Sequence, residues 1–323
     1  MLEAHLTVVG VDLDESIDLT TAEADLILVF GGDGSILHVA RRLGDRSVPV
    51  LGVNYGRFGF LADVEPDELE EGIRRWIAGD HTTAERSRLR VRHMRGGEIL
   101  GEWLALNDVV IGREDLGRMV DIELDIDGRR ALSCSGDGLI LATATGSTAH
   151  ALAAGGPLLD PTVDAVVIVP IAPHSLSTRP IVLAGSHRIE LGTRSSRSPG
   201  KFTIDGAPAM ALAEGDTVVV EDARAPLTMV RVTGGPFYEA LRVAAGLANP
   251  GRSGDRNAGD VAVADALPAE VYIFSDGALR SVPDFAWENL KPVYVPIGEE
   301  DCANLAITAF SATRTRDASD QLQ

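Results

Sequence analysis

A glycine-rich turn with one carboxylate, Gly31-Gly32-Asp33-Gly34-Ser35, is the part of this sequence best suited to chemistry. Residues 26–30 before it are all apolar and the residues after it have apolar positions at helical spacing, which predicts a buried strand, a tight turn and a helix start. A helix start offers free N–H groups and a positive dipole end, which suits phosphate. A carboxylate there is unfavourable unless it acts as a base or helps to hold a cation. The alternative is a plain turn with a capping residue.

Four further segments place polar or small side chains among apolar strands. They are Asn107-Asp108, the Gly/Ser/Thr-rich stretch from Gly136 to His150, the loop with His174 and Arg179, and the Asp205-Gly206 turn. Each has an alternative without a ligand. These alternatives are a turn at a strand end, a capping cluster with Ser147 or Thr145 as N-cap, a solvated histidine and an ordinary β-turn.

The composition limits the classes of function. A chain of 323 residues with 45% hydrophobic residues can build about two domains. A formal net charge of −19 disfavours nucleic acid and anionic membranes as partners. Only Lys201 and Lys291 are lysines, so a P-loop lysine is excluded. The 2 cysteines have no metal or redox spacing, and no leader or membrane span is evident, so we expect a cytoplasmic protein.

The chain divides into four predicted parts. Residues 1–87 alternate strands and a helix, and residues 88–235 are rich in strands with period two. Residues 236–248 form a helix expected to return to the first domain, and residues 249–323 are a linker and a tail of unknown role. The expected strands are 6–11, 26–30, 48–53, 104–111, 120–126, 138–143, 163–169, 188–191, 217–221 and 271–274, with helices over 66–78 and 147–154.

Taken in this order, the segments resemble the NAD kinase family, the ATP-dependent kinases that phosphorylate the 2′-hydroxyl of NAD to make NADP. The resemblance runs from about Asp25 to Ala245. Lipid kinases share the first motif, and phosphofructokinases also carry a Gly-Gly-Asp turn. The resemblance implies an N-terminal Rossmann-like α/β domain and a C-terminal β-sandwich-like domain. The family usually has a further strand and helix before the first motif, so the first α/β unit is expected to be shortened here.

The resemblance also implies roles for individual residues. Asp33 is implied as the general base, or as the group that orients the hydroxyl and helps to hold Mg²⁺. Other positions implied in binding are Gly31, Gly32 and Gly34 for the triphosphate, Phe60 for the NAD site, Asn107 and Asp108 for ribose and adenine, and Thr145, Thr148 and Ala149 for adenine and pyrophosphate. His150 stands where the family has a tyrosine that contacts NAD, and Ala144 stands where the family has proline. Asp137 and His174 resemble residues that are contributed across a subunit interface, and the resemblance implies that Asp205 lies near the same pocket.

The implied cofactors are Mg²⁺ or another divalent cation, with ATP or polyphosphate as the donor and NAD as the acceptor. No side chain is assigned as a metal ligand. A homodimer or homotetramer is implied. Two alternatives stay open from the sequence: a catalytically impaired NAD-binding protein, and a kinase of the wider superfamily that acts on a lipid or another hydroxyl.

Overall fold

The structure is a computed structural model that describes residues 7–12, 15–55, 59–113, 119–175, 178–193, 200–232 and 270–275. For residues 208–210 and 270–275 the backbone alone is described. The described residues belong to two compact units, the first drawn from Met1–Leu43, Val48–Ala84 and Thr228–Gln323, and the second from Gly44–Ser47 and Glu85–Leu227. The predicted helix at 236–248 and the predicted linker up to residue 269 lie outside the described residues.

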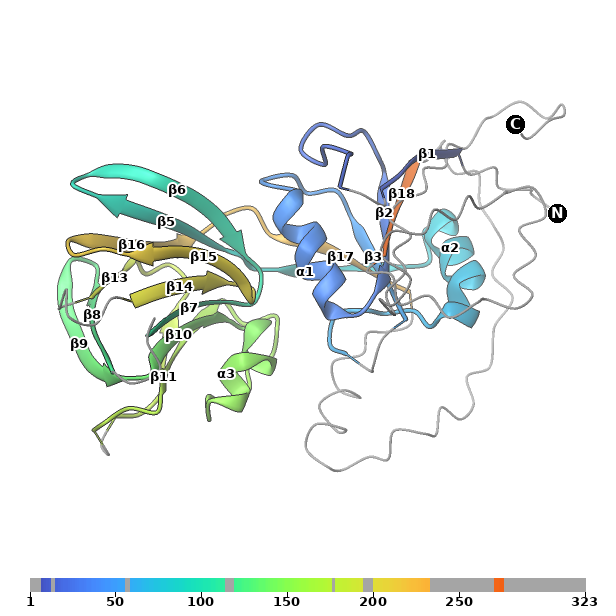
Figure 1. The fold of residues 1–323 in the computed structure, drawn as a ribbon. Helices are drawn as coiled ribbons and strands as arrows, with labels where there is room; N and C mark the ends of the chain where they lie inside the picture. The colour runs from blue at the N-terminus through green and yellow to red at the C-terminus, as the bar shows by residue number, and fades with distance from the viewer. Residues whose placement is uncertain are drawn as a thin grey trace, which may run out of the picture. The chain divides into compact units, whose positions relative to one another are not determined.

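The first unit contains a six-stranded sheet in the order β1-β18-β2-β3-β17-β4 (Figure 1). The pairings of β1 with β18, β18 with β2, β2 with β3 and β3 with β17 are parallel, as expected where strands alternate with helices. Its strands are β1 (Thr7–Val11), β2 (Leu26–Gly31), β3 (Val50–Asn54), β4 (Thr82–Arg86), β17 (Leu227–Arg231) and β18 (Glu270–Ser275). The three strands predicted between residues 6 and 53 are therefore confirmed.

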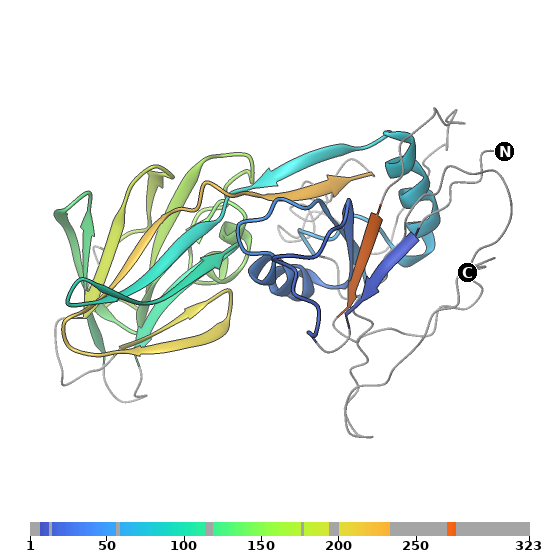
Figure 2. The same cartoon turned by 90° about the horizontal axis from the view of Figure 1, so that it is seen from above.

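Strand β18 comes from the C-terminal tail and lies between β1 and β2 (Figure 2). Val271 pairs with both Val8 and Leu26, and Ser275 pairs with Phe30 at the carboxyl end of β2. The strand predicted at 271–274 is confirmed. The tail thus supplies an internal strand of the sheet that carries the glycine-rich turn.

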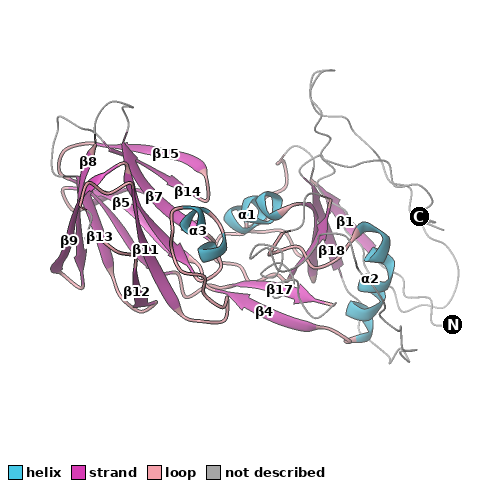
Figure 3. Ribbon diagram, turned by 90° about the horizontal axis from the view of Figure 1, so that it is seen from below, coloured by secondary structure: helices cyan, strands magenta, loops and turns pink. Residues whose placement is uncertain are grey.

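Two helices cover opposite faces of this sheet (Figure 3). Helix α1 (Asp33–Arg42) directly follows β2, whereas the 3₁₀ turn η1 (Pro66–Glu68) and helix α2 (Leu69–Ala78) follow β3. Alternate residues of β2 and β3 pack with α2 in a cluster that includes Leu28 and Val53. This arrangement fixes the carboxyl end of β2, where the turn begins.

The second unit is built from two antiparallel six-stranded sheets. The first has the order β12-β11-β10-β7-β14-β15, with β7 (Asp108–Arg113), β10 (Gly138–Thr143), β11 (Ala165–Ile171), β12 (Ile181–Ala184), β14 (Gly200–Ile204) and β15 (Ala207–Leu212). The second has the order β6-β5-β16-β13-β8-β9, with β5 (Leu89–Arg95), β6 (Glu98–Ala105), β8 (Val120–Ile126), β9 (Arg129–Gly136), β13 (Ile189–Thr193) and β16 (Asp216–Asp222).

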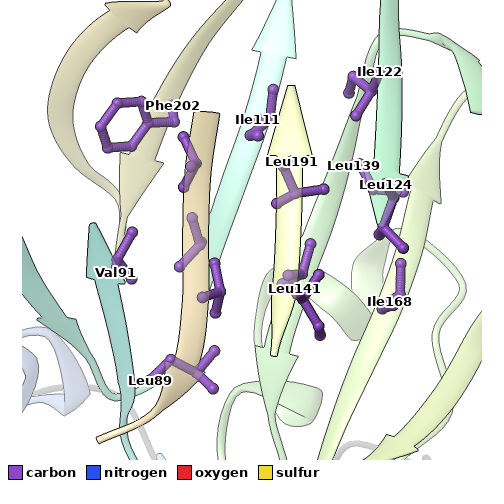
Figure 4. Close-up of a cluster of buried hydrophobic side chains, with 14 of the residues drawn as sticks. Leu89, Val91, Ile111, Ile122, Leu124, Leu139, Leu141, Ile168, Leu191 and Phe202 are labelled. Carbon is purple, nitrogen blue, oxygen red and sulfur yellow. The ribbon is translucent and has the colours of Figure 1, made fainter. Parts of the chain in front are cut away.

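The two sheets share one apolar core, which makes the unit a β-sandwich (Figure 4). Side chains such as Ile111 and Leu141 from the first sheet pack with Leu124 and Leu191 from the second. Alternating burial along β8 follows from its sequence, where apolar and acidic residues alternate. The predicted combination of an α/β part and a β-sandwich-like part is confirmed.

Two predicted elements differ from the observed ones. The strand expected over 104–111 is two strands, β6 and β7, because the chain breaks at Leu106 and Asn107. The helix expected over 147–154 is a 3₁₀ turn, η2 (Gly146–Thr148), followed by the single-turn helix α3 (His150–Ala153). Ala149 between them has φ −102° and ψ −125°, which is not helical.

Candidate active site

Asp33 is the first residue of α1, and Gly32 precedes the helix with an extended backbone. Gly31 at the end of β2 takes a φ of 157°, which a residue with a side chain rarely adopts. The predicted order of strand, glycine-rich turn and helix start is confirmed. The turn therefore presents Asp33 together with the free N–H groups of a helix N-terminus.

A loop that follows β3 holds the carboxylate of Asp33. The N–H of Phe60 donates to Oδ2 at 3.0 Å, and the N–H of Leu61 donates to Oδ1 at 3.1 Å. Gly59 makes this contact possible, because a Cβ at that position would lie 2.4 Å from Oδ1 of Asp33. Each carboxylate oxygen keeps a second lone pair. Asp33 is thus fixed in place with capacity left to accept a proton or another hydrogen bond.

The glycines beside Asp33 leave room around the turn. A Cβ at Gly32 or Gly34 would meet no described atom within 4 Å, so packing among the described residues does not require glycine there. Ser35, in the first turn of α1, has a buried hydroxyl oxygen with no hydrogen-bond partner among the described residues. The open space at Gly32 and Gly34 would allow a ligand to approach the backbone closely.

In the second unit, Asp205 holds the turn that carries two predicted binding residues. Its carboxylate accepts hydrogen bonds from the N–H groups of Leu106 at 2.9 Å, Asn107 at 2.7 Å and Asp108 at 3.1 Å. Asp205 has a positive φ of 48° in the Asp-Gly turn between β14 and β15. These contacts explain the break between β6 and β7, because the backbone N–H groups there donate to the carboxylate of Asp205 instead of to a neighbouring strand.

The Asn107 turn also contacts the end of β10. The hydroxyl of Thr143 donates to the carbonyl of Leu106 at 2.6 Å and accepts the N–H of Gly146 at 3.0 Å. Gly146 packs so closely that a Cβ there would lie 2.0 Å from the carbonyl oxygen of Asn107. Two segments whose contacting residues Leu106 and Thr143 are 37 positions apart in the sequence therefore meet at one end of the sheet, as do the residues of the Asp205 turn.

The hydroxyl residues after β10 have different surroundings. Ser147 donates to the carbonyl of Ala144 at 2.6 Å and accepts the N–H of Leu159 at 3.0 Å. Neither Ser147 nor Thr145 caps η2 with its side chain. The Thr145 hydroxyl is buried without a partner among the described residues, whereas Thr148 donates to the carbonyl of Thr145. Ala149 is half-buried and His150 is exposed.

Asp108 is buried beside Asp205. Burial, and then the charge of Asp205, raise the pKa of Asp108 to about 7. Asn107, by contrast, is half-buried. Asn107 lies in the break between β6 and β7, whereas Asp108 is the first residue of β7, so the two side chains need not serve one ligand in the same way. The carboxyl of Asp108 changes charge near neutral pH, which few aspartates do.

Asp137 and His174 lie at the other end of β10. Asp137 directly precedes this strand and pairs with Arg113 at 3.3 Å, and the N–H of exposed His174 donates to the carbonyl of Ser135 at 2.8 Å. Six residues of strand span about 20 Å, so one chain does not bring these residues to Thr145.

Several residues that build these sites carried no recognisable signal in the sequence. Gly59 and Leu61 act through close packing or backbone groups, and Arg231 reaches the carbonyl of Leu61 from 170 residues away. The family resemblance implies a place for Asp205 near the pocket, but nothing in the sequence indicates its contacts with three backbone N–H groups.

Within the described part of the chain, no group of three or more His, Cys, Asp and Glu side chains could hold a metal ion. The described helices include none with the length and apolar character needed to span a membrane.

Comparisons with known proteins agree with this arrangement. Residues 11–81 match the family model of the ATP-NAD kinase N-terminal domain, and residues 106–232 match that of the ATP-NAD kinase C-terminal domain. An NAD kinase of Thiobacillus denitrificans is 42% identical over 225 residues, which cover 70% of this chain and 77% of that protein. An NAD kinase of Alcanivorax borkumensis is 38% identical over 253 residues, covering 78% and 83%.

Two solved structures are similar to this one. Yeast NADH kinase complexed with NADH has a TM-score of 0.66 at 31% identity, covering 72% of this chain and 69% of that one. An NAD kinase from Archaeoglobus fulgidus in complex with ATP has a TM-score of 0.59 at 25% identity, covering 70% and 84%. On the fold, the two family matches and this identity, the chain belongs to the NAD kinase family, whose reaction is the ATP-dependent phosphorylation of NAD at its 2′-hydroxyl.

Proposed function

We propose that Asp33 is the general base of the reaction by which this kinase makes NADP. As the 2′-hydroxyl oxygen attacks the γ-phosphorus of ATP, its proton passes to the carboxylate of Asp33 and ADP leaves. The observation that carries this proposal is the clamp on Asp33, whose two oxygens accept the N–H groups of Phe60 and Leu61 and keep one lone pair each. Phosphoryl transfer depends mainly on such positioning and on charge stabilisation.

The triphosphate of ATP is proposed to bind at the start of α1. Free N–H groups and the helix dipole attract phosphate there, and the open space at Gly32 and Gly34 allows the backbone to approach it. Gly31 contributes the backbone conformation of the turn. ATP is the donor in this family, and polyphosphate is the second candidate donor for the same site.

The adenosine half of NAD is proposed to bind through the second unit. Asn107 and Asp108 would contact its ribose and adenine, and Thr145, whose buried hydroxyl has no hydrogen-bond partner among the described residues, would line the site. Thr148, Ala149, His150 and Asp205 complete the proposed set in this unit, and Phe60 of the first unit is proposed as a further NAD-binding residue. NADH is a second candidate acceptor, because one similar solved structure is an NADH kinase complexed with NADH.

A divalent cation, Mg²⁺ in the first instance, is proposed to enter on the phosphates of ATP. The described residues fit this mode rather than a protein cage, because they contain no group of three metal-ligating side chains. When bound, the cation neutralises the developing charge on the phosphates. Asp33 is the side chain best placed to support it, because it stands at the phosphate end of α1.

We also infer a homodimer or homotetramer in the cytoplasm. Asp137 and His174 lie at the end of β10 remote from Thr145, so they could reach an NAD site only if that site belongs to another subunit. Size-exclusion chromatography with light scattering tests the oligomer directly.

The test of the base is a comparison of turnover with binding. NADP formation by the purified protein is measured in a coupled dehydrogenase assay, and NAD binding by calorimetry, for the wild type and Asp33→Asn. We expect turnover to fall by about 10²-fold or more, the range for loss of a general base, with NAD affinity little changed. Unchanged turnover would contradict the assigned role.

A further inference from the structure

The side chain of Arg231 is buried at the end of β17, in the same unit as Asp33. It is 5% exposed, and its Nη1 donates to the carbonyl of Leu61 at 2.8 Å. The same nitrogen lies 3.5 Å from Oδ1 of Asp63, a carboxylate with no exposed side-chain surface. Asp63 in turn accepts the N–H of Val232 through Oδ2 at 2.8 Å. A buried cation therefore fastens the segment 61–63 to strand β17.

This fastening continues to Asp33 through a single residue. Leu61 accepts the guanidinium with its carbonyl and donates its own N–H to Oδ1 of Asp33. Its neighbour Phe60 donates to the other oxygen of the same carboxylate. Displacement of the Leu61 backbone would move both donors, so the position of the Asp33 carboxylate depends on the contact between Arg231 and Leu61.

Electrostatics support the same relation. Burial lowers the pKa of Arg231, while the nearby carboxylates of Asp63 and Asp33 oppose that shift. The charge of Asp33 is therefore one of those that stabilise the buried guanidinium. Its Nη2 is buried without a hydrogen-bond partner among the described residues, so the side chain is not in an ideal site for stability alone.

We propose that Arg231 is a positioning residue for phosphoryl transfer, which holds the loop of Phe60 and Leu61 so that Asp33 meets the acceptor hydroxyl in a reactive geometry. This inference rests on the role of Asp33 proposed above. Arg231 contacts neither substrate in this scheme. Its loss should therefore lower kcat while the KM values for NAD and ATP stay close to those of the wild type.

Arg42 provides a matched control within the same unit. It pairs with Asp12, whose side chain is also fully buried, and its Nη2 donates to the carbonyl of Ile17 at 2.6 Å. The chemistry is the same as at Arg231, a buried carboxylate and one backbone carbonyl. Arg42, however, lies at the opposite end of α1 from Asp33 and holds a different segment.

The experiment compares Arg231→Met and Arg231→Lys with Arg42→Met and Arg42→Lys, in the full chain. For each we measure kcat, both KM values and the melting temperature, with assays run below the lowest melting temperature. We expect Arg231→Met to lose about 10²-fold in kcat, the cost of a misplacement near 1 Å, with KM changes within a few-fold. Arg231→Lys should recover about tenfold of that loss, because it keeps a charge and a donor without the planar fork. The Arg42 variants should lose stability but keep kcat.

Three outcomes would overturn the inference. They are an unchanged kcat in both Arg231 variants, a loss of kcat that the Arg42 variants share in proportion to lost stability, or a loss that appears in KM alone. If Arg231→Met does not fold, Arg231→Lys against Arg42→Lys decides between these results. Asp33→Asn is assayed beside them. Retained turnover in Asp33→Asn refutes the proposed base itself, whereas lost turnover there with normal kcat in Arg231→Lys and Arg231→Met refutes the role of Arg231 alone.

Discussion

Replacing Asp205 by asparagine should weaken NAD binding by loosening the turn that carries Asn107 and Asp108. The carboxylate of Asp205 accepts three backbone N–H groups within 3.1 Å. An asparagine tolerates the positive φ of 48° at this position, so the backbone need not change. Its amide has one oxygen only. Whichever way the amide turns, at least one of the three N–H groups then faces an NH₂ donor.

The magnitude follows from these contacts. A buried donor left unpaired costs about 1–3 kcal/mol, and the bonds that remain lose the contribution of the charge, about 1 kcal/mol in total. We therefore expect about 2–4 kcal/mol less stability for the turn in Asp205→Asn. At about 1.4 kcal/mol per factor of ten, a part of this cost is enough to raise the KM for NAD about tenfold.

The assay measures kcat and the KM values for NAD and ATP, with NAD binding by calorimetry as a second readout. Asp127→Asn is the matched control, because Asp127 also has a positive φ in an Asp-Gly turn of the same unit and accepts the N–H of Arg188 at 3.0 Å. We expect the KM for NAD to rise in Asp205→Asn and not in Asp127→Asn. The KM for ATP should stay unchanged in both variants. Equal KM values for NAD in the two variants would refute the reasoning.

Three further predictions concern other parts of the chain. Gly59→Ala should lower kcat more than it lowers the affinity for NAD, because the new Cβ would lie 2.4 Å from the carboxylate of Asp33. Gly192→Ala is the control, since its Cβ would meet nothing closer than 3.6 Å, and equal kcat values in the two variants would contradict the prediction. Asp108, whose pKa is raised to about 7 first by burial and then by a neighbouring carboxylate, keeps its proton in the native state up to about pH 7, so its contribution to stability falls as pH rises from about 4 to 7. The melting temperature of Asp108→Asn relative to the wild type should therefore be higher near pH 8 than near pH 5. A difference in melting temperature that does not depend on pH would contradict the raised pKa of Asp108. Deletion of residues 249–323 removes β18 from between β1 and β2 and should lower the melting temperature, whereas an unchanged melt would show that the first sheet does not need this strand.

Local patterns in the sequence are sufficient to predict the strand and the helix on either side of the glycine-rich turn. The strand, turn and helix around Asp33 are contiguous, and each has a periodicity or turn residue that specifies it. The same holds for the hairpin at Asp127-Gly128, where alternation and turn chemistry agree. The family resemblance added the order of the motifs and the implied roles, which contiguous patterns alone do not contain.

Features that depend on distant partners were not predictable in this way. The break at Leu106 and Asn107 interrupts an apolar run because Asp205, 98 residues from Asn107, takes its N–H group. The sequence does not distinguish Gly59 from other loop glycines, because its close contact with the carboxylate of Asp33 depends on the tertiary structure. Arg231 ends an ordinary strand, and its contact with Leu61 requires β17 to pair beside β3. Pairings over such separations are set by tertiary packing, which one sequence does not reveal.

The most direct test of the central claim is a crystal structure of Asp33→Asn with NAD and ATP bound, in which transfer is blocked. The measured quantity is the distance from the side-chain oxygen at position 33 to the 2′-oxygen of the adenosine ribose. The account predicts hydrogen-bond contact, about 2.6–3.2 Å directly or through one water. A 2′-hydroxyl that lies beyond the reach of a single bridging water, with the loop of Phe60 and Leu61 in its present place, would contradict it.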